Sequence, residues 1–280
     1  MEAKHKDERG MMRWVILISL GLVLIVSLFP FLYMASTALR PRAEIFRYPP
    51  AWLPQVWAWR NFVDIWTAVP LARYVLNSVI IAGGSTVLNM LCAIPAAYAL
   101  ARLKFRGRKL LRHLLLTTQM FSPIVLIIGL FKLVVAAHLQ NTYLSLIMTY
   151  AALSVAFSVW FLAGYFEAVP EEIEQAAQVD GCSRLGALTR VVLPMSAPAI
   201  IAALVFAFIW AWNDFMIALT FVSTPEMRPL TLGIYSFLGQ YLIEWHYLMA
   251  ASLVTVVPVV LLFFSIEKYL VKGLTAGAIK

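Results

Sequence analysis

The chain has 280 residues, of which 62% are apolar and only 13% are charged. Soluble domains carry roughly 25% charged residues, so this composition excludes an ordinary soluble protein and indicates a membrane protein. The formal net charge of +8 fits lysine and arginine beside the cytoplasmic ends of membrane spans. No aromatic–basic platform or zinc-ligand spacing accompanies this charge, so we expect no nucleic-acid partner.

Six long apolar segments are predicted to be transmembrane helices. A spanning helix needs about 20 mostly apolar residues, and backbone groups in lipid must be satisfied internally, which favours helices over open strands. We therefore expect an all-α membrane protein that forms a single transmembrane domain over residues 1–280. The expected spans cover residues 14–36, 74–101, 112–131, 143–165, 195–220 and 246–267.

The first apolar run follows a polar segment of mixed charge. It extends over about 26 residues, which is too long for the core of a signal peptide, so we expect an uncleaved first span. The stretch YPPAWLPQVWAWRNF then places several tryptophans in the first outer loop. Tryptophan is typical of the membrane–water interface, and we favour that role for the loop over a sugar-stacking platform.

Basic residues set the expected orientation. The stretch RLKFRGRKLLR, residues 102–112, lies directly between two spans, and short loops rich in lysine and arginine mark the cytoplasmic side. With the N-terminus inside, most of the 22 lysines and arginines fall on that side. We therefore expect both termini and the loop at residues 167–194 to be cytoplasmic.

Several spans contain residues that interrupt or loosen helices. These are Gly83, Gly84, Pro95, Pro123 and Pro258. Proline removes a backbone hydrogen bond and can kink a helix, whereas paired glycines let helices approach closely. The sequence leaves open whether these residues serve packing or form hinges in a moving bundle.

The stretch EEIEQAAQVDG, residues 171–181, is unusually acidic for so apolar a chain. A preceding proline and acids in the first turn favour a helix over about residues 170–179. Helical spacing places four residues on one face, which are Ile173, Ala176, Ala177 and Asp180. Because the two alanines on this face have small side chains, another surface could approach the helix closely there.

A turn and a second helix are expected to follow. Gly181 is predicted to end the first helix in a backbone conformation that a Cβ would penalise. Ser183 can then cap a helix over residues 184–192, and Pro194 and Pro198 mark the return to the membrane. The block thus predicts a helix-turn-helix between the fourth and fifth spans. The alternative is an amphipathic connector with a solvated acidic face.

Asp214, in the stretch WAWNDF, is the ionisable residue nearest the interior of a span. Such a residue is costly in hydrocarbon and is a functional-site hypothesis by default. Trp210, Asn213 and Asp214, together with Asn77 of the second span, are our candidates for lining a substrate pathway. The alternative is that Asn213 and Asp214 satisfy the interior of a bundle or lie near the outer water boundary.

No pattern typical of catalysis is present. The chain lacks a G-x-x-x-x-G-K-[ST] phosphate-binding loop, and it has no Ser/His/Asp pattern or paired carboxylates. Cys92 and Cys182 predict neither a disulfide framework nor a metal site. We therefore expect a protein that is not an enzyme and that holds no metal or cofactor on this chain.

The acidic block resembles the cytoplasmic EAA loop of ABC-importer permeases, in the stretches EQAAQVDG and VVLPMSAP. Other stretches resemble the second permease subunit of maltose-type carbohydrate importers. These are FPFLYMASTALRP (29–41), YVLNSVIIAGG (74–84), AYALARLKFRGRK (97–109), FAFIWAWNDFMIAL (206–219) and the segment 244–280. Their order and spacing extend the resemblance over nearly the whole chain.

In that family the EAA loop is a coupling helix that lies in a cleft of an ATP-binding subunit. The residues carried over to this contact are Glu174, Gln175, Ala176, Ala177, Asp180, Gly181 and Pro194. Gln175 stands where the family has glutamate, so Glu174 is the candidate to supply the charge instead.

The resemblance also implies partners and a location. The partners are a homologous second permease, a dimeric ATPase that holds ATP and magnesium, an extracytoplasmic binding protein and membrane lipid. The location is the cytoplasmic (inner) membrane of a bacterium or archaeon, and the substrate is a di- or oligosaccharide or a related polyol. The alternatives are a stand-alone secondary transporter of small polar solutes and an ABC permease for a non-sugar substrate such as glycerol phosphate.

Overall fold

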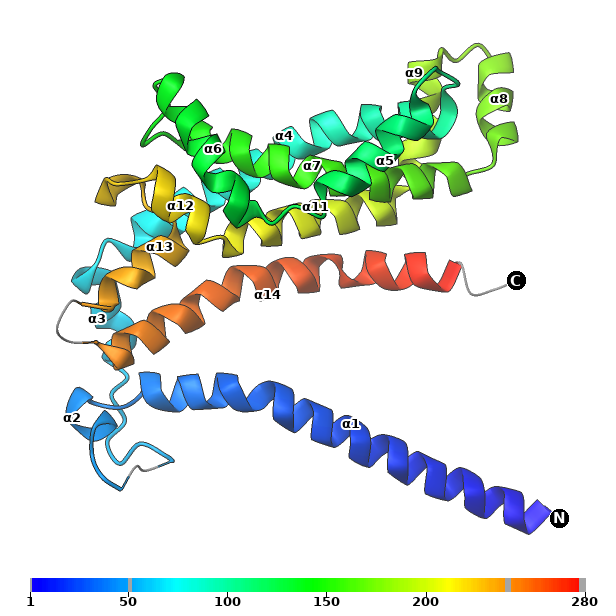
Figure 1. Ribbon diagram of the computed structural model, residues 1–280. Coiled ribbons are helices and arrows are strands. Elements are labelled where there is room, and N and C mark those ends of the chain that lie inside the picture. Colours follow the sequence, from blue (N-terminus) through cyan, green and yellow to red (C-terminus); the bar gives the residue numbers. More distant parts are fainter. Residues whose placement is uncertain (1, 50–51, 240–242, 277–280) are drawn as a thin grey trace. The chain divides into compact units, whose positions relative to one another are not determined.

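The computed structural model describes residues 2–49, 52–239 and 243–276, which form helices and contain no β-strand (Figure 1). The predicted all-α fold class is therefore confirmed for this part of the chain. The chain divides into two compact units. The first comprises Met1–Val69 and Ile234–Val256, and the second comprises Pro70–Gly233 and Val257–Lys280.

The two units differ in size. The helices of the first unit are α1 (Glu2–Ala38), α2 (Arg42–Ile45), α3 (Asn61–Ala68), the 3₁₀-helix η3 (Tyr235–Phe237) and the start of α14 (Trp245–Ala276). The second unit contains α4 (Leu71–Arg102), α5 (Arg108–Thr118), α6 (Pro123–Ala136), α7 (Tyr143–Ala168), α8 (Glu171–Val179), α9 (Arg184–Ala187), the π-helix η1 (Leu188–Val192), α10 (Leu193–Met195), α11 (Ala197–Asn213), α12 (Met216–Phe221), the 3₁₀-helix η2 (Pro225–Met227) and most of α13 (Leu230–Ile234).

Four of the described helices contain segments that are long and apolar enough to cross a membrane. They are Met12–Ala38, Leu71–Arg102, Tyr143–Ala168 and Trp245–Glu267. Two bent pairs, α5 with α6 and the α9–α10 segment with α11, bring the number to six if each pair is one span.

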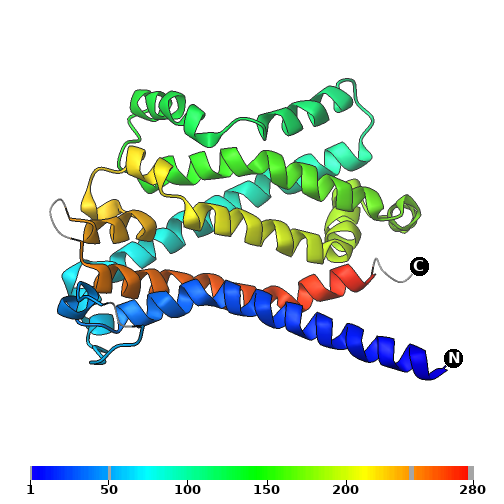
Figure 2. The same cartoon turned by 60° about the horizontal axis from the view of Figure 1, so that its bottom comes forward.

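The core of the second unit is built on three helices. α4 and α7 form the most extensive contact and α11 packs against both, so the three run side by side in both views (Figures 1 and 2). A Cβ added at Gly84 would lie 2.8 Å from Cδ1 of Ile147 on α7, whereas one at Gly83 would meet no atom within 4 Å. Gly84 therefore serves close packing of α4 on α7.

The expected third span, residues 112–131, is two helices instead of one. α5 and α6 meet at 101°, and α6 begins at Pro123. Proline disfavours a helical backbone in the residue before it and has no N–H to continue the ladder. Ser122 accordingly has an extended backbone (φ −65°, ψ 129°). Pro123 thus starts a helix and does not kink one.

The expected fifth span, residues 195–220, is bounded differently. The segment Arg184–Met195 and α11 meet at 80° around Ser196, and α11 ends at Asn213. The backbone of Asp214 is extended (φ −68°, ψ 137°), and the separate helix α12 follows. The predicted span therefore contains the end of α11 at Asn213, which the apolar composition of the segment did not reveal.

The tryptophan-rich loop of the first unit is held by polar side chains. The Asn61 side chain donates to the carbonyls of Ala38 (2.8 Å) and Arg40 (2.9 Å). Trp57 and Trp59 stack with ring centroids 5.9 Å apart and are both exposed. The interfacial role of this loop stays a prediction.

Candidate functional site

The acidic block folds as a helix, a turn and a second helical segment beyond the ends of α4 and α7 (Figure 1). Gly181 has a φ of +91°, and the amide of Cys182 closes the helix end by donating to the carbonyl of Ala177 (2.9 Å). The hydroxyl of Ser183 accepts from the amide of Gly186 (3.1 Å). The predicted glycine turn and serine cap are confirmed.

The second helical segment is longer than expected. α9 passes directly into the π-helix η1 and then into α10. The helical backbone thus continues to Met195, past Pro194, which lies within α10.

Glu174 is the one acid of α8 that is buried, with 5% of its surface exposed. Its Oε2 accepts from Nε of Arg102 at 2.8 Å, and its Oε1 accepts from the hydroxyl of Tyr98. The Arg102 guanidinium also donates through Nη2 to the carbonyl of Val169 (2.6 Å). One buried arginine therefore joins the end of α4, the end of α7 and the middle of α8.

Glu174, the residue expected to replace the family's glutamate at position 175, forms its ion pair within the chain. The carboxylate of Glu174 is directed at the chain's own α4, whereas the expectation was that it presents its charge to a partner. Gln175 is exposed, as are Ala176, Asp180 and Gly181. Nothing in the sequence revealed Tyr98 or Arg102 as partners of Glu174, since Arg102 served there only as a marker of topology.

The outer face of α8 lies opposite Glu174. At 100° per residue, the helix places Glu172, Ala176 and Val179 on that side, and we call these three residues the α8 outer face. Val179 is 87% exposed. An apolar side chain this exposed on a short polar helix is available for contact with another surface.

A second ion-pair cluster joins α5 to α7. Nη2 of Arg108 lies 2.9 Å from Oε1 of Glu167, and Arg112 pairs with the same oxygen. Both arginines also donate to carbonyls near the end of α4, those of Ala101 and Leu100, at 3.2 Å. The basic stretch that set the expected orientation thus also fastens three helices together.

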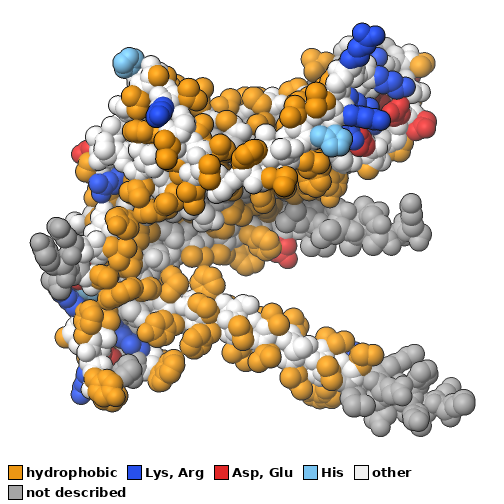
Figure 3. Space-filling model, viewed as in Figure 1, with side chains coloured by type: hydrophobic (Ala, Val, Ile, Leu, Met, Phe, Trp, Pro, Cys, Tyr) orange, Lys and Arg blue, Asp and Glu red, His pale blue; other side chains and the backbone are white. Residues whose placement is uncertain are grey.

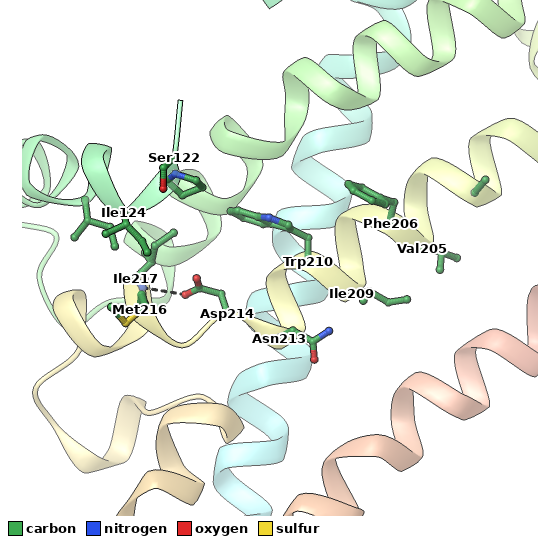
Figure 4. A pocket seen from close by; sticks show the side chains of 13 residues that line it. Ser122, Ile124, Val205, Phe206, Ile209, Trp210, Asn213, Asp214, Met216 and Ile217 are labelled. Atoms are coloured by element: carbon green, nitrogen blue, oxygen red, sulfur yellow. Dashed lines mark hydrogen bonds between the residues drawn. The ribbon is translucent and has the colours of Figure 1, made fainter. Parts of the chain in front are cut away.

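Three of the four candidate pathway residues border a cavity of about 670 Å³ between α6, α11 and α12 (Figure 4). Trp210, Asn213 and Asp214 line it, and its other walls are mostly apolar. The indole of Trp210 meets the ring of Tyr150 edge-on, with centroids 5.6 Å apart. The Asn213 amide points the opposite way from the indole (Figure 4).

Asp214 forms the corner between α11 and α12. Its Oδ2 accepts from the hydroxyl of Tyr150 (2.9 Å) and from the amides of Ile217 (3.0 Å) and Ala218 (3.3 Å). Its backbone carbonyl accepts from the hydroxyl of Thr231 (2.7 Å). One carboxylate oxygen therefore satisfies the first amides of α12, while the residue as a whole still borders the cavity.

Asn77 lies apart from this cavity and is 1% exposed. Its Nδ2 donates to the carbonyls of Glu226 (2.9 Å) and Arg228 (2.8 Å), and its Oδ1 accepts from the hydroxyl of Tyr143 (2.7 Å). Its polar groups are therefore used in joining α4, α7 and the segment around η2.

We expect Glu174→Gln to loosen α8, because the substitution leaves the buried Arg102 guanidinium without a counter-charge, and breaking a buried pair costs about 3–5 kcal/mol. Limited trypsin digestion of the purified transporter measures this as faster cleavage after the exposed Arg184. A rise of about ten-fold or more is expected, since ~1.4 kcal/mol corresponds to a factor of ten. Glu171→Gln removes the same charge from an exposed position of α8 outside the outer face and should leave the rate unchanged. Equal rates in both variants would show that the ion pair does not position α8.

Asp214→Ala should lower the melting temperature of the purified transporter more than Asp214→Asn does. Alanine removes the acceptor at the start of α12, which costs about 1 kcal/mol for a helix cap, whereas asparagine retains an acceptor oxygen. Thermal unfolding followed by intrinsic fluorescence measures the difference. Equal melting temperatures in the two variants would contradict a capping role.

The sequence of the chain is similar to those of known transport proteins. A model described as binding-protein-dependent transport system inner membrane component matches residues 90–276. The sulfoquinovosyl glycerol transport system permease protein of Agrobacterium fabrum is 36% identical, over 94% of this chain and 92% of that protein. The trehalose/maltose transport system permease protein of Thermococcus litoralis is 35% identical, over 98% of this chain and 99% of that protein.

A solved structure has a similar fold. It is a crystal structure of a bacterial ABC transporter involved in the import of the acidic polysaccharide alginate, with a TM-score of 0.79 and 20% identity. The match covers 92% of this chain and 96% of that chain. The present chain therefore belongs to the family of inner-membrane permease components of binding-protein-dependent ABC transport systems.

Proposed function

We propose that this chain is one of two homologous permease subunits of an ABC importer for a di- or oligosaccharide or a related glycoside. The family match and the relatives support this proposal, because the names of two relatives specify trehalose and maltose in one case and sulfoquinovosyl glycerol in the other. All of these compounds contain a glycosidic bond. In the proposed assembly an extracytoplasmic binding protein delivers the substrate, and a separate ATPase dimer holds ATP and magnesium.

The proposed topology has six spans within one transmembrane domain and both termini in the cytoplasm. Its support is the clustering of cations at one end of the second unit. The basic stretch 102–112 is bonded there to the ends of α4 and α7, and Arg184 of α9 lines a cavity together with Arg102. Positive charge of this density is typical of the cytoplasmic side of a span, which supports a cytoplasmic position for α8.

The observation that carries the coupling role is the contrast between the two sides of α8. Glu174 and Arg102 tie the inner side to α4 through a buried bond of 2.8 Å, while the outer face presents Ala176 and the exposed Val179. In the proposed mechanism the ATPase cleft receives this outer face, with Gln175, Asp180 and Gly181 at its edge. When the ATPase dimer closes, α8 and the end of α4 then move as one body.

The proposed pathway passes the cavity beside Trp210, Asn213 and Asp214. An aromatic face stacks on the C–H groups of a sugar ring, while amide and carboxylate groups bond its hydroxyls, and a few such polar groups in an apolar cavity give specificity. Asn77 contributes indirectly in this scheme, since it holds Tyr143 and the segment around η2 in place.

Reconstitution tests the proposed function directly. The chain is incorporated into proteoliposomes with a candidate partner permease, ATPase and binding protein from the same organism. We expect ATP hydrolysis to be stimulated by binding protein loaded with a disaccharide, accompanied by uptake of the labelled sugar, and no stimulation by glycerol phosphate. Uptake that proceeds without the ATPase would overturn the ABC assignment, and stimulation by glycerol phosphate alone would overturn the sugar assignment.

The same proteoliposomes test the coupling face. Ala176→Trp should reduce uptake by more than ten-fold while the subunit remains in the membrane, because the bulky ring blocks close approach of the ATPase. Ala137→Trp makes an equal change at an exposed alanine after α6 and should transport normally. Normal uptake by Ala176→Trp would refute docking through the α8 outer face and leave the sugar assignment intact.

A further inference from the structure

A second groove, of about 400 Å³, lies between α4, α5 and α7, away from the proposed pathway. Its walls are mostly aliphatic and aromatic, from Leu100, Leu115, Trp160 and Phe161, and its charged lining residues are Arg112 and Glu167. Trp160 and Tyr165 are 45% and 44% exposed. Half-exposed tryptophan and tyrosine are typical of the level where lipid chains meet headgroups.

α5 has the composition of a helix that lies in a membrane interface. Its sequence, RKLLRHLLLTT, combines leucines with basic residues, and none of its 11 residues is buried in the protein. A basic amphipathic helix with a polar face and an apolar face binds at the boundary between headgroups and acyl chains. The 101° bend before α6 gives α5 a direction different from that of α6.

Cations outnumber acids on the segment beside the groove. Arg108 and Arg112 share a single carboxylate, that of Glu167, so one positive charge remains in the cluster. Lys104, Arg106 and Lys109 are exposed on the adjoining segment. The acids Glu171 and Glu174 of α8 line a different cavity, together with Arg102 and Arg184. In Figure 3, Lys and Arg side chains gather at this end of the unit beside hydrophobic ones.

We propose that this groove binds one anionic diacyl phospholipid of the cytoplasmic leaflet. An acyl chain occupies the apolar groove between α5 and α7, and the phosphate lies among Arg112 and the exposed cations of residues 104–109. Basic pockets between membrane helices on this side are suited to anionic headgroups. The lipid would fill the apolar space under α5 and neutralise charge that Glu167 alone leaves uncompensated.

Gentle extraction of the whole transporter, followed by native mass spectrometry, tests the site with phosphatidylglycerol and phosphatidylcholine of identical acyl chains as probes. We expect phosphatidylglycerol to be retained at least about five-fold over phosphatidylcholine, since a cation near an anionic surface contributes about that factor. Equal retention of the two lipids would overturn the proposal.

Three variants separate the chain groove from the headgroup site. Gly164 lines the groove, and a Cβ there meets no atom within 4 Å, so Gly164→Phe should fill the groove and abolish retention of both lipids. The double variant Arg106→Ala, Lys109→Ala should remove the preference for phosphatidylglycerol. Lys132→Ala, which removes an exposed cation of α6, should leave that preference unchanged. A double variant that retains the full preference would contradict the headgroup site, even if Gly164→Phe fails to fold.

A crosslinking experiment identifies the occupant. Benzoylphenylalanine in place of Tyr165 introduces a photoreactive aromatic group at the groove. Illumination of the transporter in native membranes should give an adduct with the mass of a phospholipid. An adduct with another protein subunit would show that a partner helix fills the groove, which would overturn the lipid assignment.

Discussion

The buried ion pair between Arg102 and Glu174 is the interaction on which the functional end of the second unit depends. Removing two charges from water is costly, and their attraction compensates only when the remaining hydrogen-bonding groups are also satisfied. Here Tyr98 and the carbonyl of Val169 complete that set. Such a pair adds little to net stability, but it defines position, because every displacement of α8 exposes an uncompensated charge. The ion pair and its two further hydrogen bonds therefore hold α8 against the ends of α4 and α7.

The opposite end of the same bundle uses an acid in a similar way. Asp214 lies where an apolar span ends, and its carboxylate is satisfied by a tyrosine hydroxyl and two backbone amides. In both places one acidic side chain lies where helices that are far apart in the sequence come into contact. The two acids differ in their surroundings, since Glu174 lines a small polar cavity with Arg102 and Arg184 while Asp214 borders a larger, mostly apolar one.

Sequence reasoning succeeded where the signal was local. The glycine turn at Gly181 and the cap at Ser183 follow from the backbone preferences of those residues, and the structure has both. The break before Pro123 was underestimated, because hydropathy averages over a segment and does not register one missing N–H. Glu174 and Arg102 are 72 residues apart, and no periodicity connects them. The corner at Asp214 was likewise hidden, because a helix cap from aspartate resembles a functional charge until its partners are known.

The 80° junction at Ser196 has a mechanical consequence for the cavity. α11 is a straight arm that starts at this corner, and Trp210 stands 14 residues along it, or about 21 Å at 1.5 Å per residue. A tilt of the arm about the corner therefore displaces the Trp210 backbone by about 0.4 Å for each degree. Ten degrees of tilt amount to roughly 4 Å, which is comparable to the thickness of a sugar ring. A modest rotation at the base of α11 is therefore geometrically sufficient to change the space beside the indole, and it would also shift the contacts of α11 with α4 and α7.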